Sequence, residues 1–195
     1  MIRRTLLSFW LTAALAFSLA LALAPTASHA AEVEITEARL EYTDEGYKLA
    51  AAFNFALNGS LESAIARGIP LYFTTEVVIR RPRWYWLDER AASATQTIRI
   101  SYNVLTRQYR AAINGSNLQQ GFDSLEDAIS LVRRPGRWLV APPDALRPGE
   151  TYTVALRMEL DIAQLPKPFQ VHSINSSDWR LSSDWRYFTY RVDGK

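Results

Sequence analysis

The sequence of 195 residues contains no cysteine. This absence excludes disulfide bonds, a lipid anchor attached to cysteine, and nucleophilic catalysis by a Cys–His pair. The stability of the fold must therefore come from its hydrophobic core. Once a predicted N-terminal signal is removed, a chain of about 165 residues remains, which is long enough to bury roughly 70% of its unfolded surface as one domain.

Histidine is also scarce, with His29 in the predicted signal and His172 near the other end of the chain. A Ser–His–Asp triad would have to use His172, but no sharp strand-to-helix turn presents a serine near it. The sequence has no glycine-rich phosphate loop and no dinucleotide fingerprint. We therefore expect no cofactor, no metal and no enzymatic activity. The alternative is an envelope-modifying hydrolase that acts on glycan or peptide.

Residues 1–30 have the three parts of a secretory signal. Arg3 and Arg4 give a positive start, residues 6–24 form an apolar run, and Ser28 and Ala30 place small side chains before the next bond. We predict cleavage between Ala30 and Ala31, which leaves a periplasmic domain of residues 31–195. The alternative is an uncleaved inner-membrane anchor, because residues 6–24 approach the ~20 residues that a spanning helix needs. Only in that case do we expect membrane contact.

The charge of the chain is balanced once the signal is removed. The full sequence has 22 basic and 20 acidic residues, and the loss of Arg3 and Arg4 leaves 20 of each. Proteins that bind nucleic acid usually carry a clustered basic excess. The balance, together with the predicted export, therefore argues against nucleic acid as a partner.

Alternation of apolar and polar residues dominates the rest of the chain, as is typical of strands with one buried face. The clearest runs cover residues 47–57, 98–104, 109–113 and 152–162. Residues 71–79 are apolar on nearly both faces and predict a central strand. Residues 33–42 change parity after Ile35, which indicates a bulge, and residues 137–140 and 185–192 complete the set.

Turns and short helices connect these strands. Residues 44–46 and 106–107 predict two hairpin turns. One helix is expected over residues 61–67, capped by Ser60, and another over residues 125–134, capped by Asp123 or Ser124. We predict a mainly β fold: a two-layer antiparallel β-sandwich of about eight strands with two short crossover helices.

Two short runs, residues 80–86 and 133–138, combine arginine with tryptophan. These residue types are enriched in binding hot spots, and a guanidinium group stacks well on an indole ring. The candidate interaction surface consists of Arg81, Arg83, Trp84, Trp86, Arg134, Arg137 and Trp138. Packing is the competing explanation, and the pattern favours it, because Trp84 and Trp86 occupy alternate positions of a strand end and one face could bury both.

A third pattern, Ser-Ser-Asp-Trp-Arg, occurs at residues 176–180 and again at 182–186. It is too short for a structural repeat, and its side-chain oxygens are suited to capping turns. Together with residues 81–89 and the predicted hairpin at 98–109, this segment resembles the bacterial domain-of-unknown-function family 4390, which comprises exported proteins of Gram-negative bacteria.

The resemblance implies neither an activity nor catalytic residues. Genes of that family often lie beside a sensor kinase, which implies an accessory to a membrane signalling protein. We therefore expect a non-enzymatic periplasmic binding or interaction domain with an envelope or membrane protein as partner. A structural envelope component is a further alternative.

Overall fold

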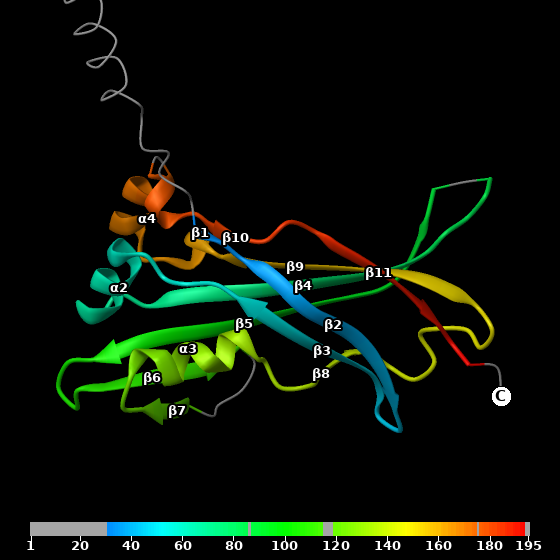
Figure 1. Ribbon diagram of the computed structural model, residues 1–195, viewed down its shortest axis with the longest axis horizontal. Helices are drawn as coiled ribbons and strands as arrows, with labels where there is room; N and C mark the ends of the chain where they lie inside the picture. Colours follow the sequence, from blue (N-terminus) through cyan, green and yellow to red (C-terminus); the bar gives the residue numbers. More distant parts are fainter. Residues whose placement is uncertain (1–30, 86, 115–118, 175, 194–195) are drawn as a thin grey trace, which may run out of the picture.

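The computed structural model describes residues 31–85, 87–114, 119–174 and 176–193. The signal predicted for residues 1–30 therefore lies outside the described residues. The described chain folds into two β-sheets that pack face to face, with short helices at the edges (Figure 1). This arrangement confirms the predicted mainly β sandwich.

The larger sheet has eight strands, all paired antiparallel except β1 with β10. Its order is β1 (Ala31–Glu32), β10 (Leu181–Ser182), β9 (Thr151–Leu160), β4 (Leu71–Arg81), β5 (Glu89–Asn103), β6 (Gln108–Ile113) and β7 (Gln119–Phe122), while β11 (Arg186–Arg191) also pairs with β9. Strand β4 lies between β9 and β5 and pairs with a neighbouring strand on both edges. This confirms the central strand predicted from residues 71–79.

The smaller sheet consists of β2 (Glu34–Thr43), β3 (Gly46–Asn54) and β8 (Trp138–Ala141). The predicted β2–β3 hairpin turns at Gly46, whose φ of 128° is one that other residues rarely adopt. A Cβ atom at this position would lie 2.4 Å from the carbonyl oxygen of Ala141, so the close approach of β8 also requires glycine. The predicted bulge lies in β2, between Ile35 and Glu37.

Helix α3 (Leu125–Arg133) begins at its predicted cap, Ser124, whose hydroxyl accepts a hydrogen bond from the Asp127 N–H at 3.1 Å. The predicted cap of α2 (Gly59–Ala66) was wrong. Asn58 caps this helix, and the Ser60 hydroxyl instead donates to the Asp178 carboxylate at 3.0 Å. The helix begins at Gly59, two residues before its predicted start at Leu61, and the apolar spacing did not reveal this earlier start.

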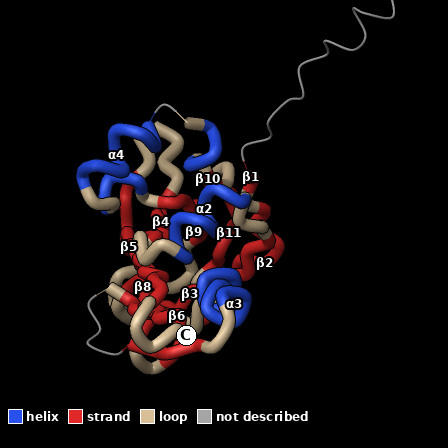
Figure 2. The backbone as a smooth tube through the Cα atoms, turned by 90° about the vertical axis from the view of Figure 1, so that its left-hand side faces the viewer, coloured by secondary structure: helices blue, strands red, loops and turns tan. Residues whose placement is uncertain are grey.

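The sequence did not predict β7, α4 (Lys167–Ile174), the short β1–β10 pair or the two 3-10 helices. Residue His172, the histidine outside the predicted signal, belongs to α4. The segment has no amphipathic periodicity, so the sequence pattern did not indicate a helix. Helices α2 and α4 gather at one end of the sandwich, with the 3-10 helices η1 (Ile162–Gln164) and η2 (Ser177–Trp179), as Figures 1 and 2 show.

The core lies between the two sheets and receives every second residue of the long strands. Its fully buried side chains include Leu49 of β3, Phe73 and Val77 of β4, Leu156 of β9 and Ile129 of α3. The opposite face of the larger sheet carries polar residues, such as Glu76, which pairs with Arg157 at 3.0 Å. This separation accounts for the alternation seen in the sequence.

Candidate interaction surface

The first arginine–tryptophan run forms the tip of the β4–β5 hairpin. The ladder between the two strands ends with Arg81 opposite Glu89. Pro82 follows directly and has no N–H with which to continue the ladder, so the chain leaves the sheet there. Residues 81–89 are called the aromatic tip from here on. Figure 1 shows the tip projecting beyond the sandwich, at the end away from α2 and α4.

Ion pairs close the base of the aromatic tip. The Glu89 carboxylate accepts hydrogen bonds from the guanidinium groups of both Arg81 and Arg83. These two bonds, the one from Arg83 first, hold the pKa of Glu89 below its usual value. Arg81 also approaches Glu150, with 3.8 Å between Nη1 and Oε1. The two predicted arginines therefore fix the loop to its own strand rather than stacking on indole rings.

The apolar side chains of the tip point into solvent. Trp84 is 94% exposed, Leu87 is 81% exposed and Tyr85 is 67% exposed. The rings of Trp84 and Tyr85 meet edge to face, with their centroids 5.1 Å apart. The packing explanation is therefore wrong for Trp84, because β4 ends before this residue and no strand face is left to bury it. Trp86 lies outside the described residues.

The second arginine–tryptophan run has a different environment. Arg134 ends α3 as its exposed C-cap residue, and Arg137 pairs with Glu41 at 3.2 Å. Trp138 opens β8, is half-buried and packs against the core. Its indole N–H is buried and has no hydrogen-bond partner among the described residues. This run therefore joins α3 to the smaller sheet.

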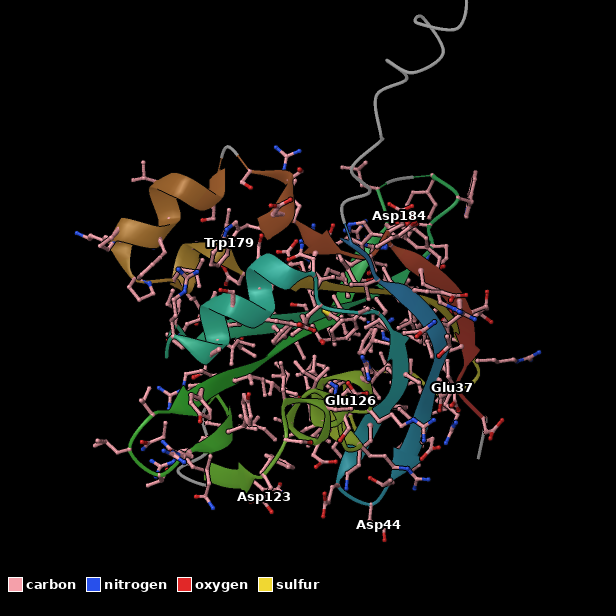
Figure 3. The ribbon with its side chains drawn as sticks, turned by 60° about the vertical axis from the view of Figure 1, so that its left-hand side comes forward. Glu37, Asp44, Asp123, Glu126, Trp179 and Asp184 are labelled. Atoms are coloured by element: carbon pink, nitrogen blue, oxygen red, sulfur yellow. The ribbon has the colours of Figure 1, made fainter. Side chains whose placement is uncertain are left out.

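The structure does not bring the two runs together. In Figure 1 the aromatic tip stands at the upper right, while β8 lies across the lower middle of the molecule. Figure 3 shows the same separation, with the tip well away from α3 and its labelled residue Glu126. The seven candidate residues are therefore not one surface. Those that the structure displays together are Arg81, Arg83 and Trp84.

Neither cation–π contact among the described residues involves a tryptophan of the two runs, although Arg133 is the first residue of the second run. Arg157 sits 4.7 Å from the ring centroid of Trp185, and Arg133 sits 5.4 Å from that of Phe55. Trp185 belongs to the second Ser-Ser-Asp-Trp-Arg segment, and in Figure 3 Trp179 marks the first, beside α2. The two segments differ in role. Ser176 caps η2, whereas the Ser183 hydroxyl accepts a hydrogen bond from the N–H of Met158 at 3.0 Å.

Sequence reasoning missed several exposed residues of this hairpin. Tyr85 and Leu87 belong to the displayed set, and Arg80 and Arg90 face each other one register position below the tip. The signal that could have found them is Pro82, which ends the strand and therefore places the following residues in a loop.

A separate cavity of about 520 Å³ lies near the C-terminal strand. Its wall includes Tyr42, Tyr47 and Tyr190, with Pro143 and Pro148 at its rim. Burial, and then the neighbouring Tyr190, raise the pKa of Tyr47 above its ordinary value. The lining also includes two carboxylates, Asp144 and Asp193, and the basic residue Arg147.

Within the described ranges, no three His, Asp or Glu side chains come close enough to hold a metal ion. In the same part of the chain, no helix is long and apolar enough to cross a membrane.

The fold and the tip define a class: an all-β sandwich domain that displays an aromatic hairpin. More specifically, the chain belongs to the family described as "Domain of unknown function (DUF4390)", whose model matches residues 30–189. The match confirms the resemblance and covers nearly all of the described chain. No curated protein and no solved structure matches.

Proposed function

We propose that the protein is a non-enzymatic periplasmic binding domain and that the aromatic tip is the element that contacts its partner. The observation that carries this proposal is the exposure of Trp84, Tyr85 and Leu87 on one projecting loop. Single exposed apolar residues are common, but contiguous groups of large ones usually mark an interaction site.

The tip is also held in place before binding. It continues from β4, the strand that pairs on both edges, and Glu89 ties Arg81 and Arg83 together at its base. A loop that is ordered in advance loses less conformational entropy when it binds. The edge-to-face contact between Trp84 and Tyr85 presents the two rings as one apolar unit.

The partner belongs to the cell envelope in this proposal. The predicted signal would export the domain, and the family resemblance implies an accessory to a membrane signalling protein. The arginine–tryptophan composition of the tip suits such contacts, because tryptophan, tyrosine and arginine dominate binding hot spots.

Site-specific crosslinking in cells tests the proposal. A photoreactive amino acid is placed at Leu87 in the full-length chain and, as a matched control, at Leu105. Leu105 is 95% exposed in the turn at the other end of β5, so both positions are equally open to solvent. We expect a discrete crosslinked product from position 87 that is absent from position 105.

A second variant links that product to the tip. Trp84→Ala, combined with the crosslinker at position 87, should weaken the product, whereas Leu105→Ala should leave it unchanged. The proposal fails if position 87 gives no product with protein or lipid, or if both positions give the same products, at a crosslinking yield that captures known envelope pairs.

A further inference from the structure

The chemistry of the aromatic tip matches the interface of a lipid bilayer. Tryptophan and tyrosine concentrate at the headgroup level of membranes, because their rings are apolar and each carries one polar group. Leu87 adds an aliphatic side chain on the same loop, and all three side chains are mostly exposed. Residues 80–90 also carry four arginines against two carboxylates, Asp88 and Glu89.

Two of these arginines form a like-charge pair. Arg80 and Arg90 lie directly opposite each other in the β4–β5 ladder, and both are exposed. Like charges in this position repel. Among the described residues, no carboxylate lies within the 4.0 Å of an ion pair from either guanidinium group, whereas Arg81 and Arg83 share Glu89. An external anion between Arg80 and Arg90 would relieve the repulsion.

The distances suit one lipid surface. Arg80 and Trp84 are four positions apart, so their Cα atoms are separated by at most ~13 Å of extended chain. The headgroup layer on each side of a bilayer is roughly 5–8 Å thick. A tip that inserts its apolar side chains at the inner edge of this layer therefore places Arg80 and Arg90 near the phosphates.

We propose that the aromatic tip inserts into the surface of an anionic phospholipid bilayer, with Trp84, Tyr85 and Leu87 among the headgroups and Arg80 and Arg90 on lipid phosphates. This inference rests on the proposed function and names its partner. The projecting shape of the tip favours a lipid partner over a folded protein. A protein would need a groove that matches the tip, whereas lipid molecules can rearrange around an inserted loop.

Flotation with vesicles tests the inference. The chain from Ala31 onward, which is the product expected from signal cleavage, serves as the protein, because the core side chains of the described residues all lie between Val33 and Val192. Vesicles of phosphatidylethanolamine with phosphatidylglycerol should float the wild-type domain. Replacing Trp84, Tyr85 and Leu87 by alanine together should weaken binding by about tenfold or more, and the control variant Leu105→Ala should not change it.

The arginine pair gives a second readout. Each arginine near an anionic surface contributes about a fivefold gain in affinity, so Arg80→Gln with Arg90→Gln should weaken binding and flatten its salt dependence. Vesicles of phosphatidylcholine alone should bind poorly. Inorganic phosphate at a matched ionic strength should not compete, and if it does release the domain, the site recognises a free anion and the lipid inference is overturned.

Insertion itself can be measured because the chain lacks cysteine. A fluorophore that senses polarity is attached to the single cysteine of Leu87→Cys or of Leu105→Cys. We expect a blue shift on vesicles at position 87 only. An unchanged label at position 87, or equal shifts at both positions, would overturn the inference.

The two proposals fail separately. If vesicles do not bind but the tip still crosslinks to one envelope protein in cells, the lipid inference fails and the proposed function stands. If neither the vesicles nor the crosslinks depend on the tip, both fail.

Discussion

The two arginine–tryptophan runs of this protein have opposite environments. Trp84 projects from a hairpin and is 94% exposed, whereas Trp138 is half-buried against the core at the start of β8. The arginines differ in the same way. Arg81 and Arg83 hold the tip to its own strand through Glu89. Arg137, which directly precedes β8, pairs with Glu41 of β2 at the other edge of the smaller sheet.

The comparison shows that the position of the strand end decides the role of a tryptophan. Pro82 stops the ladder before Trp84, so the indole has no neighbouring strand to pack on. Trp138 is the first residue of β8 and pairs with Leu49 of β3, and its ring packs against the core. One run stabilises the fold, and the other is available for binding.

The largest expected effect on stability is at Trp138. Trp138→Ala should lower the free energy of unfolding by about 2–3 kcal/mol, somewhat less than the ~3–5 kcal/mol of a fully buried tryptophan. Trp138→Phe should cost much less, because the indole N–H has no hydrogen-bond partner among the described residues that the change would remove. Denaturant unfolding measures both variants, and equal losses for Trp138→Phe and Trp138→Ala would contradict the packing role.

Glu89→Gln should loosen the aromatic tip without unfolding the domain. The substitution removes the charge that draws Arg81 and Arg83 together, so local opening becomes more frequent. Trypsin can cleave after Arg83 in the tip and after Arg107 in the β5–β6 turn. The ratio of cleavage at Arg83 to cleavage at Arg107 should rise several-fold, and an unchanged ratio would show that the ion pairs do not order the tip.

The tip should also respond to acid. Because the folded-state pKa of Glu89 lies below its ordinary value of 4.5, the folded protein binds fewer protons at this group than the unfolded chain does. Its contribution is therefore complete above about pH 4.5 and is lost as the pH falls through the lowered pKa. The carboxyl carbon shift of Glu89, followed by NMR, should titrate with a midpoint below 4.5, and a midpoint at or above that value would contradict the ion pairs.

Arg137→Gln should have the smallest effect. The side chain of Arg137 is 62% exposed, and exposed ion pairs contribute only about 0–1 kcal/mol. We expect a change in unfolding free energy within about 0.5 kcal/mol. A loss as large as that of Trp138→Ala would mean that Arg137 has a structural role beyond its contact with Glu41.

Much of the fold could be predicted from the sequence, because strand alternation reports directly which side chains face a core. The central place of β4, the bulge in β2 and the cap at Ser124 all follow from local patterns. Helix α4 could not be predicted in this way, since it lacks an apolar stripe.

The candidate site was predictable only in part. The arginine–tryptophan composition of the first run predicted a binding role for Arg81, Arg83 and Trp84. The second run has the same composition and predicted the same role for Trp138. Only the register separates the two runs, because it shows where β4 ends. The pairing of Arg80 with Arg90 depends on the same register, which requires the bulge between Ile79 and Arg80.

The most direct test of the account measures stability and binding together on Trp84→Ala with Tyr85→Ala. The account predicts an unfolding free energy within about 0.5 kcal/mol of the wild type and a clear loss of the product crosslinked at position 87. A destabilised variant would place these rings in the core, and a stable variant that keeps its full crosslinking yield would show that the aromatic tip is not the element that binds.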